Sequence, residues 1–195
     1  MSGVALDRRV LYQRVLYQRV LGARFDVLPE AVQRLHDVTM PCVWTGQCQV
    51  ERGSGLVARL AGWIGGLPPA TEGMREGFRF EVRPEGDGEI WSRGFGGMTP
   101  FKTRQWAAGA LLCERAGPMT MVFALLADGA GLRLELERCF VLGVPLPKVL
   151  HPRLEAVETE VDGAFQFDVS ARFPTGGLLV RYRGKLMPDG ADRTI

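Results

Sequence analysis

Alternation of apolar and polar residues with a period of two is the feature that most restricts the fold of this chain. The clearest segments are residues 78–83, 132–137, 165–173 and 178–183. Successive side chains of a strand point to opposite faces, so this period indicates strands with one apolar and one polar face. Short turns rich in glycine and aspartate separate the segments, as at Glu85–Gly88 and Asp128–Gly131, and they are typical of hairpins. The pattern therefore predicts about nine antiparallel strands between Gly77 and Pro188.

The apolar face of such a sheet must be covered. Closing the sheet into a barrel covers it and also removes the sheet edges, while a strongly curved sheet wrapped on helices would serve as well. We therefore expect an α+β, mainly β fold, in which N-terminal helices precede an antiparallel β-barrel or strongly curved, lipocalin-like sheet. We expect one β-rich domain at residues 16–188, an extra helical extension at 1–15 and a tail at 189–195.

The N-terminal segment predicts a helix that contains a short tandem repeat. No glycine or proline interrupts Leu6–Leu21, and the pentapeptide VLYQR occurs at Val10–Arg14 and again at Val15–Arg19. A five-residue step turns an α-helix by about 500°, so the copies point about 140° apart and cannot all face one core. Two interpretations stay open. The helix has two apolar sides and binds a partner, as in a homodimer, or the duplication only lengthens it into solvent.

Two further helices and one strand are expected before the sheet. Pro29–Asp37 is a helix with proline in its first turn, where proline is favoured, and Thr45–Arg52 alternates as a strand. Ser54 can cap a helix over Gly55–Ile64. That helix has one charged residue and is apolar nearly all round, which indicates burial. We expect it to close one end of the barrel.

Composition and charge exclude several classes of protein. Hydrophobic residues make up 46% of the chain and charged residues 24%, a globular balance that excludes a disordered chain. The net charge of +2 gives no electrostatic case for binding nucleic acid. No uncharged stretch reaches the roughly 20 residues that a membrane span requires. Because Met1–Arg9 lacks a hydrophobic signal region, we expect a cytoplasmic location.

The cysteines do not indicate a metal centre. None of Cys42, Cys48, Cys113 and Cys139 belongs to a C-x-x-C pair, and their spacing from His36 matches no common zinc pattern. We interpret them as small buried apolar residues. The chain also lacks a Gly-rich dinucleotide fingerprint, so neither a metal nor a cofactor is expected.

Polar residues at apolar positions of the alternation are candidates for an internal site. Four of them stand out: Arg93, Glu114, Arg138 and Tyr182. Trp91 has the same parity as Arg93 and would line the same interior. A buried charge is costly unless it is paired. Either an Arg–Glu pair is purely structural, or the second guanidinium holds the carboxylate or enolate of an apolar ligand. One bulge would turn any of these residues outward.

The segment Gly143–Pro152 contains three prolines, which exclude a central strand. Its apolar residues Leu146, Val149 and Leu150 would lose burial energy if exposed, so we expect them to cover an open barrel end as a lid or a fixed plug. A lid would place His151 at the pocket mouth as a general acid–base, whereas a plug would make it structural. Glu155 and Glu158, which follow, are interpreted as solvated charges.

Several motifs resemble a bacterial family known as domain of unknown function 4166. They are LYQRVLGARFDVLP, QVERGSGLVARL, IWSRGFGG, CERAGPM, LGVPLPKVLHP, DGAFQFDV and LLVRYRGKL. The resemblance runs from about Leu16 to Pro188, and the residues before Leu16 look extra. It implies a domain that stands alone here and that elsewhere can follow an NAD(P)-binding oxidoreductase domain. It carries over no catalytic residue.

Two functional hypotheses follow. In the first, a barrel pocket binds an apolar small molecule with an anionic or carbonyl group and transforms it by a cofactor-independent cyclisation or isomerisation, although the residues leave open whether the chain is an enzyme. The residues assigned are Trp91, Arg93, Arg138 and Tyr182 for ligand binding and His151 and Glu114 for catalysis. In the second, the chain is a non-catalytic accessory domain that docks on an oxidoreductase or on itself.

Overall fold

The computed structural model describes residues 15–55, 70–95 and 98–189. Three short helices come first: α2 (Leu16–Leu21), the 3-10 helix η1 (Gly22–Val27) and α3 (Glu30–His36). The strands are β1 (Cys42–Arg52), β2 (Arg75–Glu85), β3 (Gly88–Phe95), β4 (Phe101–Ala108), β5 (Leu111–Ala116), β6 (Met119–Asp128), β7 (Gly131–Val141), β8 (Val144–Pro145), β9 (Arg153–Val161), β10 (Ala164–Arg172) and β11 (Leu178–Pro188). A 3-10 turn, η2 (Lys148–Leu150), lies between β8 and β9.

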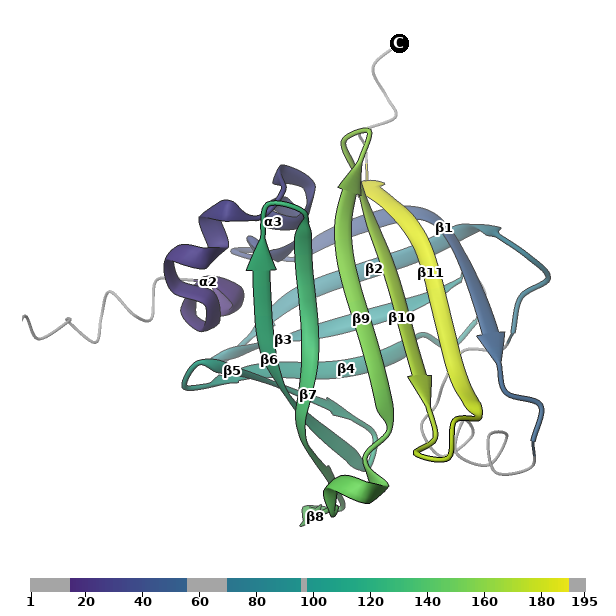
Figure 1. Cartoon of the computed structure of the whole chain (residues 1–195). Helices are drawn as coiled ribbons and strands as arrows, with labels where there is room; N and C mark the ends of the chain where they lie inside the picture. The colour runs from purple at the N-terminus through teal and green to yellow at the C-terminus, as the bar shows by residue number, and fades with distance from the viewer. Residues whose placement is uncertain (1–14, 56–69, 96–97, 190–195) are drawn as a thin grey trace, which may run out of the picture.

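Of the eleven strands in the described ranges, ten close into an antiparallel β-barrel (Figure 1). From β1 to β7 each strand pairs with the next one along the chain, and β7 then pairs with β9. Strands β9, β10 and β11 continue the sheet, and β11 pairs with β1 to close it. The two-residue strand β8 pairs with the end of β7. The expectation of a mainly β, lipocalin-like barrel is confirmed.

The alternation in sequence corresponds to the inner and outer faces of the barrel. In β2, Phe78, Phe80 and Val82 are buried, whereas Arg79 and Arg83 are exposed. The inward side chains of the strands form one hydrophobic core with residues from the helices. Because burying each large apolar side chain contributes about 1.5–3 kcal/mol, this pattern drives the sheet to close around its apolar face.

Two glycines allow β1 and β11 to approach each other closely. A Cβ atom at Gly184 would lie 2.0 Å from the carbonyl oxygen of Gln47, and one at Gly46 would lie 2.1 Å from that of Lys185. No side chain fits at such distances, so glycine is required at both positions. Glycines inside strands commonly mark such close approaches at barrel corners.

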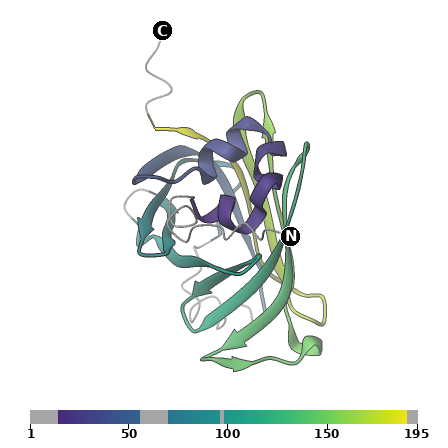
Figure 2. The ribbon, with the colours of Figure 1, turned by 90° about the vertical axis from the view of Figure 1, so that its left-hand side faces the viewer.

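Helices α2 and α3 cover one end of the barrel (Figure 2). Helix α2 packs on β4, β5 and β6, and α3 packs on β9 and β10. Leu16 and Leu35 are among their buried residues. The Ala31 amide in the first turn of α3 donates a hydrogen bond of 2.6 Å to Glu160 Oε2, which satisfies a backbone group that has no partner within a helix. The helix expected at Pro29–Asp37 is thus confirmed.

Two sequence predictions fall outside the described residues. The helix expected at Gly55–Ile64 lies outside them apart from Gly55, and so does the first VLYQR copy. The second copy, Val15–Arg19, forms the N-cap and the first residues of α2. Among the described residues, α2 and α3 cover the barrel end. The domain limits and the dimer contact stay predictions. No helix in the described ranges has both the length and the apolar character that crossing a bilayer requires.

Candidate ligand cavity

The barrel contains a cavity of about 320 Å³. It extends from Tyr17 of α2, at the end covered by helices, to Pro118, Val141 and Pro152 at the strand ends beside the β7–β9 connection. Most of its wall is apolar, including Met119, Met121, Phe123, Leu134, Leu154 and Val169. A mostly apolar pocket with a few polar groups is typical of sites for small molecules.

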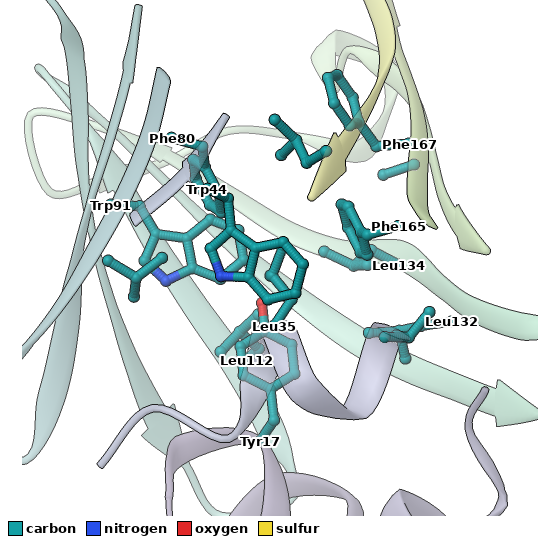
Figure 3. Close-up of a cluster of buried hydrophobic side chains, with 14 of the residues drawn as sticks. Tyr17, Leu35, Trp44, Phe80, Trp91, Leu112, Leu132, Leu134, Phe165 and Phe167 are labelled. Carbon is teal, nitrogen blue, oxygen red and sulfur yellow. The ribbon is translucent and has the colours of Figure 1, made fainter. Parts of the chain in front are cut away.

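Aromatic side chains fill the part of the barrel next to the helices (Figure 3). Tyr17 points from α2 into the interior, and its ring stacks on that of Trp91 with centroids 5.9 Å apart. Phe165 and Phe167 come from β10. Tyr17 is fully buried, and its hydroxyl donates a hydrogen bond of 3.0 Å to Gln105 Oε1. The second VLYQR copy therefore contributes to the cavity, a role that its repeated pattern did not indicate.

Arg93 and Glu114 form an ion pair inside the barrel. Arg93 Nη2 lies 3.2 Å from Glu114 Oε1, and their side chains are 11% and 12% exposed. Arg93 Nη1 also donates to Thr103 Oγ1 at 2.9 Å, and the guanidinium lies 4.9 Å from the ring centroid of Trp91. Trp91, Arg93 and Glu114 all line the cavity, as their parity predicts.

Neighbouring groups stabilise the charged form of Arg93. Burial by itself lowers the pKa of Arg93, but the negative charge of Glu114 and the hydrogen bond to it raise that pKa above its usual value, with a further contribution from Tyr182. Arg93 is therefore a permanent cation, and its two donor contacts hold it in place.

Tyr182 also lines the cavity, as its parity predicts. Burial raises the pKa of Tyr182 to about 12, against an opposing effect of Arg93. Burial likewise raises the pKa of Tyr17 well above its ordinary value, and Glu158 raises it further. Both phenols therefore remain protonated at neutral pH. Unlike Tyr17, Tyr182 has no hydrogen-bond partner for its hydroxyl among the described residues, so it can donate to a ligand.

A second buried pair, which the sequence interpretation missed, joins α3 to β9. His36 Nε2 lies 2.6 Å from Glu158 Oε2, and His36 is fully buried. The imidazole stacks on the Tyr17 ring with centroids 3.7 Å apart. Glu158 lines the cavity, so its interpretation as a solvated charge is wrong. Its parity with the inward-facing Ala156 on β9 was the available signal.

Glu89 is a buried acidic residue on β3. Its Oε2 accepts a hydrogen bond of 2.9 Å from Trp91 Nε1, while its buried Oε1 has no partner in the described part of the chain. Burial raises the pKa of Glu89, against opposing effects of the Trp91 hydrogen bond and of His36. An acid whose pKa is raised by burial holds its proton to higher pH in the folded state than in the unfolded state.

The expectation that Arg138 faces the interior is wrong. Val122 pairs with Arg138 while the next residue, Phe123, pairs with Leu136, so Glu137 is an extra residue in a β-bulge. A bulge reverses the parity of the residues that follow it. Arg138 is accordingly exposed and Cys139 is buried.

The β7–β9 connection does not cover the barrel end as expected. Val149 is 76% exposed and Leu150 is 55% exposed. His151 Nε2 donates a hydrogen bond of 3.0 Å to the Leu146 carbonyl oxygen, and the cavity is lined by the next residue, Pro152. His151 therefore makes a contact within its own loop, and it is not among the described residues that line the cavity with Glu114.

The cavity does not have the surplus positive charge that two inward arginines would give. With Arg138 outside, the described lining residues include one arginine, Arg93, and two glutamates, Glu114 and Glu158. An anionic ligand would therefore meet two carboxyl groups and a guanidinium that is already bonded.

The cysteines and the remaining acidic residues form no metal centre in the described ranges. Cys48, Cys113 and Cys139 are buried, Cys42 is half-buried and all four are free thiols, as expected of small apolar residues. No group of three or more metal-ligating side chains occurs among the residues that the structure describes.

Comparisons with known proteins place the chain in a family. No protein of curated function and no solved structure matches the sequence. The model of the family described as "Domain of unknown function (DUF4166)" matches residues 28–186, which include α3 and every strand except the last two residues of β11. The chain therefore belongs to the DUF4166 family.

Proposed function

We propose that the barrel binds an apolar small molecule that carries a carbonyl group. The observation that supports this is the contrast within one cavity between apolar walls and a polar cluster formed by Arg93, Glu114, Glu158 and Tyr182. Apolar walls supply most of the affinity of such a pocket, and a few polar groups orient the ligand.

The electrostatics favour a neutral carbonyl over a carboxylate. Arg93 already interacts with Glu114 and Thr103, and Glu158 adds a second acidic group to the lining. A ligand carboxylate would bring a third acidic group into the same space. A carbonyl oxygen adds no charge, and it accepts a hydrogen bond from the unpartnered Tyr182 hydroxyl.

The same cluster supports a cofactor-independent isomerisation or cyclisation. Glu158, oriented by His36, would take a proton from the carbon next to the carbonyl, and the C–H electron pair would form a C=C bond. The carbonyl oxygen would become an enolate oxygen that accepts a hydrogen bond from Tyr182. Return of the proton to another carbon completes an isomerisation. Alternatively, the enolate carbon attacks a second carbonyl carbon of the same molecule and closes a ring; the C=O π pair of that carbonyl moves to its oxygen, which takes the proton back from Glu158. Glu114, held by Arg93, acts here as a positioning residue.

Binding is tested with three probes of equal carbon number: decyl methyl ketone, dodecanoic acid and dodecane. A ligand that binds the folded state raises the melting temperature, and we expect the ketone to raise it most. Tyr182→Phe should reduce the ketone shift to the size of the dodecane shift and leave the dodecane shift unchanged. A larger shift with dodecanoic acid would overturn the preference for a neutral carbonyl.

Catalysis is tested by proton exchange in heavy water. Loss of the α-proton signals of decyl methyl ketone by NMR should be faster with the protein than in buffer, and Glu158→Gln should abolish this difference. Glu155→Gln, an exposed neighbour on the same strand, is the matched control and should exchange normally. Binding of the ketone without any enhanced exchange would make the barrel a binding protein.

The accessory-domain hypothesis is the alternative. It depends on the N-terminal extension, most of which lies outside the described residues, and on the domain arrangements implied by the family. If none of the three probes raises the melting temperature at saturating concentration, the binding proposal fails and this alternative is favoured.

A further inference from the structure

The β7–β9 connection exposes a cluster of large apolar side chains, here called the apolar tip. Its members and their exposed fractions are Leu142 (79%), Val144 (64%), Val149 (76%) and Leu150 (55%). The connection projects beyond the barrel strands, at the bottom of both Figure 1 and Figure 2. Clustered exposed apolar side chains of this kind mark sites of contact with proteins, ligands or membranes.

Two features of its position, the backbone conformation and the exposure to water, are unfavourable for Leu142. It has φ 52° and is followed by Gly143 with φ 82°, in the tight turn between β7 and β8. Asn, Asp or Gly suits this left-handed conformation, whereas leucine is strained in it. The leucine is also almost fully exposed to water. Neither the backbone nor the packing of the isolated chain favours an apolar side chain here, which points to a contact outside the chain.

Unpaired basic residues surround the apolar tip. Five exposed cations lie on the tip or on the adjoining strand ends, and none forms an ion pair with a described residue: Arg115, Arg138, Lys148, Arg153 and Arg172. Arg153 and Arg172 are directly opposite each other across β9 and β10, an arrangement of like charges that is unfavourable in a sheet. The exposed acids on the same strand ends are Glu137 and Glu155. Cations therefore dominate this side of the barrel end.

We propose that the apolar tip inserts into an anionic lipid surface while the surrounding basic residues contact the headgroups. Insertion of apolar side chains together with attraction of basic residues to anionic lipid is the general mode of peripheral membrane binding. Val141 and Pro152 line the cavity and flank the connection, so docking would bring this end of the cavity close to the lipid. An apolar ligand could then pass between bilayer and cavity with little contact with water.

The test is sedimentation of the full chain with phosphatidylcholine vesicles, with and without phosphatidylserine. We expect binding to the serine-lipid vesicles and its loss at high salt. The variant Leu142→Asn/Val149→Ser should lower the partition coefficient by about tenfold. Asparagine suits the left-handed turn, so this variant should fold with an unchanged or higher melting temperature. Met40→Ser, at an exposed methionine between α3 and β1, is the matched control and should bind normally.

The basic residues are tested separately with Arg153→Gln/Arg172→Gln, which should weaken binding to serine-lipid vesicles about tenfold. Arg24→Gln, an exposed arginine in η1, is its control and should have little effect. Absence of vesicle binding, or equal binding by the tip variant, would overturn the proposal. Equal binding to pure phosphatidylcholine would overturn the requirement for anionic lipid. Light scattering that shows a dimer dissociated by the tip variant, without vesicle binding, would identify the tip as a protein contact instead.

Discussion

Arg93 on β3 and Glu114 on β5 form an ion pair across the intervening strand β4, with Arg93 Nη2 3.2 Å from Glu114 Oε1. Thr103 on β4 bonds the same guanidinium, so three neighbouring strands meet at one charged group. The pair links three strands of the barrel wall and also presents two polar side chains to the cavity. Its contribution to stability can be separated from its contribution to binding.

Removing one member of this pair should cost more than removing both. Arg93→Met leaves Glu114 partly buried and unpaired, and should lower the free energy of unfolding by about 3 kcal/mol. Arg93→Met/Glu114→Leu removes both charges, and should recover most of that loss. Urea unfolding of the two single variants and the double variant measures the coupling. Additive effects of the two single changes would show that the pair does not stabilise the fold.

Glu89 should make the fold less stable as the pH rises. Burial raises the folded-state pKa of Glu89 above its ordinary value of 4.5. The folded state therefore binds the proton more tightly, and this contribution is fully present below pH 4.5 and is lost as the pH rises through the raised pKa. The free energy of unfolding of Glu89→Gln should fall less steeply over that range than that of the unmodified protein. Glu135→Gln, an exposed control, should leave the pH dependence unchanged.

The alternation of residues is enough to predict an antiparallel sheet that is closed or strongly curved, and the inward positions of Trp91, Arg93, Glu114 and Tyr182. This succeeds because inward and outward positions within one regular strand are determined locally, by a period of two. The same prediction is wrong for Arg138 because the bulge at Glu137 arises from the pairing of β7 with β6. No local pattern in the sequence encodes that pairing.

The helical part of the site was beyond sequence prediction for a different reason. Tyr17 and His36 belong to α2 and α3, and their contacts are with residues far away in sequence, such as Gln105 and Glu158. Only the docking of the helices on the barrel end brings these side chains together. The period of a short helix shows which face is apolar, but it does not show which strands that face will cover.

The bulge in β7 can be tested by two single-residue deletions. Without Glu137, the order Leu136, Arg138, Cys139 becomes a regular inward, outward, inward alternation, so the register with β6 is kept and the barrel should still form. Deleting Glu135 instead would require Leu136 to face outward and Glu137 to face inward. We expect the second deletion to destabilise the protein by several kcal/mol more than the first. Equal melting temperatures for the two deletion variants would contradict the bulge at this position.

The close approach of β1 and β11 predicts that Gly184 cannot be replaced even by alanine. A Cβ atom there would lie 2.0 Å from the Gln47 carbonyl oxygen and 3.0 Å from Cys48 Cα, so the paired strands would have to separate. We expect Gly184→Ala to lower the free energy of unfolding by about 3 kcal/mol, which corresponds to a fall of roughly 10 °C in melting temperature for a chain of this size. Gly129→Ala is the matched control, because its Cβ would have no atom within 4 Å, and it should melt at the temperature of the unmodified protein or slightly above it. If both variants had the same melting temperature, the two strands would have to be further apart than the backbone of Gln47 and Gly184 places them.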